Sequence, residues 1–108
     1  MLRPYRVWFT PEAEEDLTRL TDFLLDRAHD LEALNQVEAS IQTLRKAIET
    51  QLSSNPWSFR KAGPGDRPTR RELVVPAGAT GYVALFEIES SNRVLILAIR
   101  LQLEQDYH

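Results

Sequence analysis

Near residue 71 the spacing of apolar residues changes from a helical to a strand pattern, and that change constrains the fold more than any other feature. Before it, apolar residues recur every three or four positions in two runs: Ala13, Leu17, Leu20, Leu24 and Ala28, then Leu34, Val37, Ile41, Leu44, Ile48 and Leu52. Such spacing is the stripe of an amphipathic helix. After it come short segments rich in β-branched and aromatic residues, at 72–75, 81–88 and 94–100. These predict strands.

A further strand is expected at residues 5–9, ahead of the helices. The predicted order is therefore β-α-α-β-β-β. This order describes an α+β domain in which a helix hairpin packs on one face of an antiparallel sheet. At 108 residues the chain has the usual length of one domain, and we expect a single domain over residues 1–108.

Local signals mark the ends of the helices. Thr10 can accept a bond from a free amide of the next turn, and Pro11 suits the first helical position. Four acids follow, Glu12, Glu14, Glu15 and Asp16, where the helix dipole favours negative charge, so they do not indicate a metal site. Asn55-Pro56 should end the second helix.

The composition excludes several classes of site. The chain has no cysteine, so disulfides, thiolate metal sites and cysteine nucleophiles are impossible. It also lacks a phosphate-loop motif, an HExxH pair and a GxSxG elbow, and we expect neither a cofactor nor a metal. The longest apolar run, residues 94–99, is too short for a membrane helix. A cytoplasmic protein with no membrane contact is expected.

Two features of the pattern leave alternatives open. The first is the core, which is predicted to contain Leu17, Leu20, Leu24, Ile41, Leu44, Ile48, Leu85, Leu95 and Leu97. In the strand at 81–88, however, Tyr82 and Phe86 share one face while Val83 and Leu85 share the other, and both faces are apolar. The sequence does not say which of these faces is covered by helices.

The second open feature is a basic segment in a chain of net charge −3. Its cations are Arg60, Lys61, Arg67, Arg70 and Arg71, opposed by Asp66. It is either a solvated loop or a contact for an acidic partner. We predict that the adjacent Trp57 and Phe59 cover the junction of the second helix with the sheet.

Several of these segments, taken in order, resemble one known family. They are Thr10-Pro11-Glu12-Ala13-Glu14, Asn55-Pro56, Arg71 to Val75, Gly81 to Phe86 and Val94 to Arg100. Together they resemble the RelE/ParE superfamily of type II toxin–antitoxin toxins over nearly the whole chain. The resemblance implies a growth-arresting toxin and a cognate antitoxin whose partly disordered segment folds over the apolar surface left uncovered by the helices.

The superfamily has two branches, which imply different targets. The RelE-like branch cleaves mRNA on the ribosome, and for it the chain offers Arg70, Arg71, Arg100, Tyr107 and His108. However, Val83 follows Gly81-Tyr82 where that branch has an arginine, Glu72 stands where a cation is expected, and Gln102 lies near the position of a late arginine.

These departures favour the ParE-like branch, whose characterised members inhibit DNA gyrase. The target-binding candidates are then Arg60, Lys61, Arg67, Arg70, Arg71 and Arg100, and the protein is not expected to be an enzyme. An inactive member that serves only as a binding module is the remaining alternative.

Overall fold

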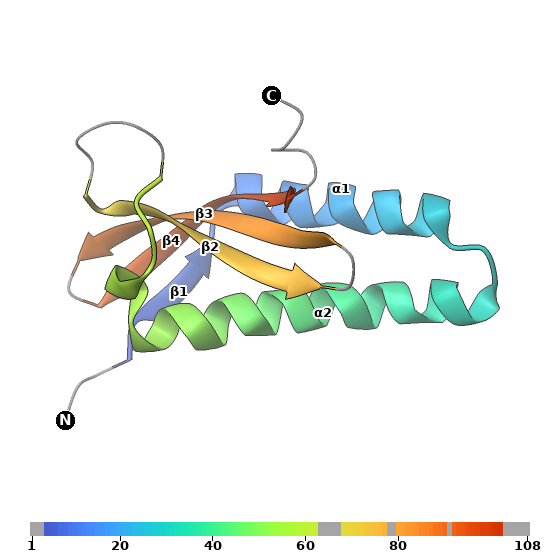
Figure 1. Cartoon of the computed structure of the whole chain (residues 1–108), viewed down its shortest axis with the longest axis horizontal. Coiled ribbons are helices and arrows are strands. Elements are labelled where there is room, and N and C mark those ends of the chain that lie inside the picture. The colour runs from blue at the N-terminus through green and yellow to red at the C-terminus, as the bar shows by residue number, and fades with distance from the viewer. Residues whose placement is uncertain (1–3, 63–67, 78–79, 91, 103–108) are drawn as a thin grey trace.

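The structure is a computed structural model that describes residues 4–62, 68–77, 80–90 and 92–102 (Figure 1). Its elements follow the predicted order: β1 (Arg6–Phe9), α1 (Pro11–Arg27), α2 (Leu31–Ser54), a short 3-10 helix η1 (Pro56–Ser58), β2 (Arg70–Ala77), β3 (Thr80–Ser90) and β4 (Arg93–Leu101). The α+β class and the helix hairpin are thus confirmed. None of the helices in the described part of the chain is both long and apolar enough to span a membrane.

The sheet has the strand order β1-β4-β3-β2 and is mixed. The pairs β2–β3 and β3–β4 are antiparallel, as predicted, but β1 lies parallel to β4, with Arg6 opposite Arg93. The expectation of a wholly antiparallel sheet is wrong in this one pairing. A parallel pair needs a long connection, and the two helices with β2 and β3 provide it.

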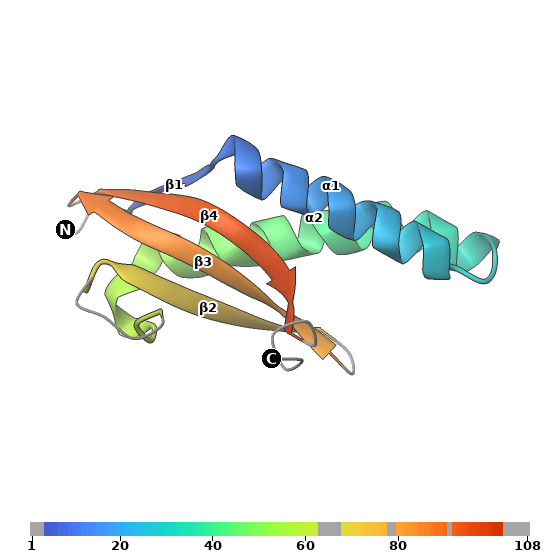
Figure 2. The same cartoon turned by 90° about the horizontal axis from the view of Figure 1, so that it is seen from above.

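Both helices lie on one side of the sheet, as Figure 2 shows. Tyr82, Ala84, Phe86 and Ile88 of β3 join the helix leucines and isoleucines in the core, and the Phe86 side chain is fully buried. This answers the question of which strand face is covered. The Val83 and Leu85 positions face away from the helices.

The end of α1 nearest the sheet is held by two short contacts. The Thr10 side chain accepts the N–H of Ala13 at 3.1 Å, as predicted for the helix start, and its hydroxyl donates to the Ile96 carbonyl of β4 at 2.7 Å. Farther along, Arg45 of α2 makes a two-bond contact with Glu14 of α1 at 2.7 and 2.8 Å. The hairpin is therefore fixed to the sheet at β4, and its two helices are fixed to each other.

A bulge in β4 corrects part of the predicted core. Phe86 pairs with Ile96, but Leu85 pairs with Ala98, so Leu97 is an extra residue between them. Beyond the bulge the alternation is shifted by one, and Ile99 points into the core.

The sequence placed Leu85, Leu95 and Leu97 in the core, but all three are only half-buried. Leu97 lies in the bulge, whereas strand alternation directs Leu85 and Leu95 to the sheet face away from the helices. Leu24 is half-buried as well. The buried Asp16 carboxylate accepts the Ile99 N–H at 2.8 Å and so ties α1 to the shifted part of β4.

Candidate functional site

The sheet face turned away from the helices, here called the open face, carries both apolar and charged side chains. Its members are Trp8, Arg70, Glu72, Val74, Val83, Leu85, Glu87, Leu95, Ala98 and Arg100. Strand pairing sets them in rows: Arg100 beside Val83 and Val74, Ala98 beside Leu85 and Glu72, and Leu95 beside Glu87 and Arg70. Trp8 continues the last row across β1.

Most arginines on or beside this face are neutralised by carboxylates. Arg60 donates to Glu72 at 3.1 Å, and Arg70 donates to Glu87 at 3.0 Å, where the Thr69 hydroxyl also bonds. Arg93 and Glu89 form a third pair at 2.9 Å. These exposed or half-exposed pairs contribute little stability, but each cancels a positive charge on the surface.

Arg71 has a different role from its neighbour Arg70. Its guanidinium donates to three backbone carbonyls, of Pro68 at 2.9 Å, Trp57 at 3.2 Å and Phe59 at 2.6 Å, and it lies 5.1 Å from the Trp57 ring centroid. The Arg71 guanidinium thus links β2 to the segment before it.

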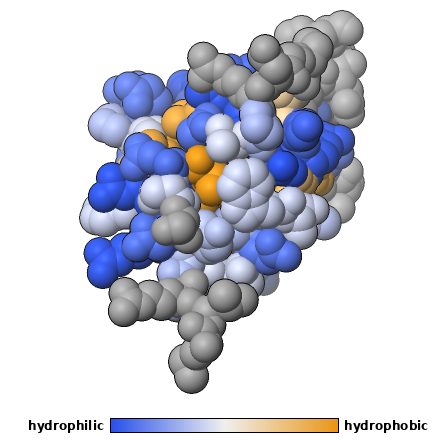
Figure 3. Space-filling view, turned by 90° about the vertical axis from the view of Figure 1, so that its left-hand side faces the viewer, coloured by the Kyte–Doolittle hydropathy of each residue, from blue (hydrophilic) through white to orange (hydrophobic). Residues whose placement is uncertain are grey.

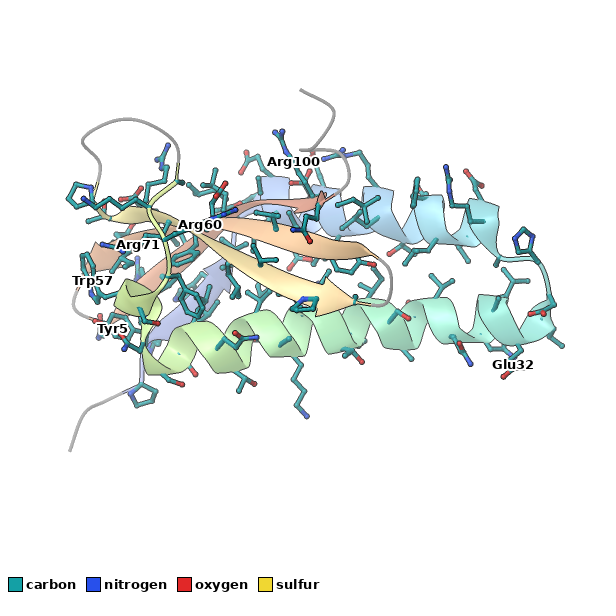
Figure 4. All side chains as sticks on the ribbon, viewed as in Figure 1. Tyr5, Glu32, Trp57, Arg60, Arg71 and Arg100 are labelled. Atoms are coloured by element: carbon teal, nitrogen blue, oxygen red, sulfur yellow. The ribbon has the colours of Figure 1, made fainter. Side chains whose placement is uncertain are left out.

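The segment that Arg71 holds also pairs with the edge of β2. The Glu72 N–H donates to the Arg60 carbonyl at 3.0 Å, and the Ala62 N–H donates to the Arg70 carbonyl at 2.9 Å. Lys61 lies between these bonds with an exposed side chain. Figure 4 shows Arg60 and Arg71 toward the end of the molecule that carries Trp57.

Arg100 is separate from that cluster and lies near the end of β4 (Figure 4). It lines a hollow of about 170 Å³ with Glu72, Val83, Leu85 and Ala98. No carboxylate of the described residues pairs with it.

The structure therefore brings Arg60, Arg70 and Arg100 to the open face. Arg71 instead bonds to backbone carbonyls of the segment before β2, and Lys61 has an exposed side chain at the edge of the sheet. The other sequence candidates, Arg67, Tyr107 and His108, lie outside the described residues.

The prediction for the two aromatic residues before the basic segment holds for Phe59 and only in part for Trp57. Phe59 packs edge-to-face on Phe86, with ring centroids 6.2 Å apart. Trp57 is 44% exposed, and its indole N–H donates to the Tyr5 hydroxyl at 3.1 Å. Figure 3 views this end of the molecule, where mostly hydrophilic residues surround a small hydrophobic patch.

Trp8 is an exposed residue that was not among the candidates predicted from the sequence. It is 50% exposed and lines a hollow of about 310 Å³ with Phe9, Arg93 and Leu95, and the Arg93 guanidinium lies 5.9 Å from its ring centroid. The signal was present in the alternation of β1. Val7 and Phe9 pack on the core, so Trp8 between them must face outward.

A larger groove runs between the helices and β2, here called the α2–β2 groove. Its volume is about 820 Å³. Apolar side chains line most of it, including Leu24, Ala39, Ala47, Val75, Pro76 and Tyr82, and the polar ones are uncharged. Burial raises the pKa of the Tyr82 phenol, which stays neutral at ordinary pH. The groove is thus mostly apolar, and its lining is uncharged.

In the described part of the chain, no three histidine, aspartate or glutamate side chains gather as metal ligands would. The open-face arginines Arg60 and Arg70 are engaged with carboxylates, and Val83 fills the position between Arg100 and Val74.

Comparisons with known proteins agree with this architecture. The family model of the ParE toxin of the type II toxin–antitoxin system parDE matches residues 7–106. A search of curated proteins returned no match. A solved structure from the chromosomal ParDE toxin–antitoxin system of P. aeruginosa superimposes with a TM-score of 0.64 at 17% identity, and the alignment covers 88% of this chain and 92% of that one. With the family model matched over nearly its whole length, the chain belongs to the ParE toxin family of type II toxin–antitoxin systems.

Proposed function

We propose that this protein arrests bacterial growth by binding a protein target in the cytoplasm, that the target is DNA gyrase, and that a cognate antitoxin neutralises it. Membership of the ParE toxin family supports the toxin role, and the similar fold comes from a ParDE system. The observation that carries the binding mechanism is the pairing of open-face arginines with carboxylates.

That pairing argues against RNA cleavage at this face. Cleavage requires free cations near the developing negative charge of the phosphorane, and losing one such contact typically costs about 3 kcal/mol of transition-state stabilisation. Arg60 and Arg70 donate to Glu72 and Glu87 instead. Val83, which stands where the ribonuclease branch has an arginine, adds no charge.

We propose that the antitoxin binds in the α2–β2 groove, whereas from the sequence we expected it on the surface left uncovered by the helices. Antitoxin segments that fold on binding need an apolar surface large enough to offset the entropy lost on ordering. The groove is larger than either hollow on the open face, and its lining has no charged side chain that would have to be desolvated. An amphipathic segment with aliphatic anchors fits this chemistry.

Induction in bacteria tests the activity. The expected result is growth arrest that co-expressed antitoxin relieves, with inhibition of supercoiling by purified gyrase and no codon-positioned messenger cuts. Codon-positioned cuts that vanish when His108 is deleted would instead establish the ribonuclease alternative. Intact supercoiling without cuts, in arrested cells, would reject gyrase as the target.

A single substitution tests the groove. Ala39→Glu places a carboxylate in the groove, and we expect at least a tenfold weaker antitoxin affinity by titration calorimetry. Asn35→Glu, on an exposed part of the same helix outside the groove lining, is the matched control and should bind normally. Equal affinities for the two variants would show that the antitoxin docks elsewhere.

A further inference from the structure

We infer that the open face is the surface that engages the target, and that the occupant is a protein segment presenting an aliphatic side chain next to a carboxylate. The inference rests on the proposed function, because it concerns the target of the toxin. Its basis is a hollow that apolar and charged side chains line together, with an arginine that has no carboxylate partner among the described residues.

The apolar half of the site is formed by β3 and β4. Val83, Leu85 and Ala98 line the hollow of about 170 Å³, which has room for one aliphatic side chain. Leu95 on β4 leads from this hollow to Trp8, where the second hollow of about 310 Å³ begins. An exposed tryptophan beside arginine and leucine is typical of the anchoring residues of protein interfaces.

The charged half is Arg100. Arg60, Arg70 and Arg93 each have a carboxylate partner, so their capacity to attract a further anion is reduced. Arg100 is exposed, lines the hollow, and has no carboxylate partner in the described part of the chain. A guanidinium in this setting can hold an incoming carboxylate by two parallel bonds.

The same face is poorly suited to nucleic acid. Arg60, Arg70 and Arg93, on or beside this face, are already paired with carboxylates, so their capacity to neutralise a phosphate backbone is reduced. The chain as a whole carries a net charge of −3. Because nucleic-acid affinity depends mostly on neutralising phosphates, the occupant indicated by these charges is a protein.

The open-face hollow and the α2–β2 groove share the strands β2 and β3 but are lined by different residues of them. Glu72 and Val83 line the hollow, whereas Val75 and Tyr82 line the groove. Target binding and antitoxin binding should therefore be separable by substitution. An antitoxin seated in the groove would contact the same two strands as the target and would hinder the approach of a large enzyme.

The test compares charge reversals on the two sides of the molecule. Arg100→Glu should abolish growth arrest and raise the concentration needed to inhibit gyrase at least tenfold, while antitoxin affinity stays within twofold of wild type. Arg100→Lys should retain part of the activity. Lys46→Glu, an equal charge change on the exposed side of α2, is the control and should remain toxic.

Trp8→Ala provides a second variant on the same face, and melting curves report whether either variant still folds. If wild type arrests growth and both folded variants do so equally well, the open face is not the target surface. A parallel loss of antitoxin affinity would make the antitoxin its occupant. Gel shifts of DNA or RNA that Arg100→Glu abolishes would make it a nucleic acid. If wild type itself is not toxic, the proposed function fails before this comparison begins.

Discussion

Replacing Arg71 by alanine should destabilise the fold, because this side chain donates hydrogen bonds to three backbone carbonyls before β2. Hydrogen bonds to charged groups contribute about 1.5–3 kcal/mol each when protected from water. Only the bond to the Phe59 carbonyl, at 2.6 Å, is part-buried, so we assign it about 1.5 kcal/mol and the two exposed bonds about 0.5 kcal/mol each. The expected loss of unfolding free energy is about 2.5 kcal/mol.

Urea unfolding of the purified chain measures this loss. With a slope of about 1–3 kcal/mol per M, the urea midpoint should fall by about 0.8–2.5 M. Arg70→Ala is the matched control, since it removes a half-exposed ion pair worth about 0–1 kcal/mol. An unchanged midpoint for Arg71→Ala, together with weaker target or antitoxin binding, would show that these hydrogen bonds do not stabilise the fold and that Arg71 is a binding residue.

Three further predictions concern the core, a close backbone approach and acid stability. Phe86→Ala removes a fully buried ring and should lower the unfolding free energy by about 3–5 kcal/mol in the same urea assay. Gly81→Ala would place a Cβ 3.0 Å from the Val75 carbonyl oxygen, and a thermal melt should show a loss of about 1–3 kcal/mol. The hydrogen bond from Arg45 lowers the pKa of the Glu14 carboxyl, so the stability that this pair provides is present above the unfolded pKa of 4.5 and lost as pH falls through the lower folded value. Because Glu14 is about half exposed, the effect should be below about 1 kcal/mol, and Glu14→Gln should flatten this part of the acid unfolding curve.

The sequence by itself determined the element order, the start of the first helix and the end of the second. Helix stripes, the Thr10 cap and the proline after α2 act through neighbours a few residues away, so they can be recognised without the fold. The same holds for the absence of cysteine chemistry. Residues 71–75 and 81–86 also carried the family resemblance, which the family model confirms.

Only the tertiary structure decided which side of the sheet each strand residue occupies. The bulge at Leu97 shifts the alternation of β4, so Ile99 turns to the core and Arg100 to the open face. One extra residue in a strand moves every later side chain to the opposite face of the sheet, and no local sequence pattern predicts it. The parallel pairing of β1 with β4 is likewise a contact between distant segments.

The roles of the arginines were decided in the same way. Arg70 and Arg71 are adjacent and chemically identical, yet strand alternation directs one to a carboxylate on the open face and the other to backbone carbonyls before β2. A cation's function depends on what lies within about 3 Å of its guanidinium. Those partners come from positions 12 to 17 residues away along the chain, and folding alone brings them together.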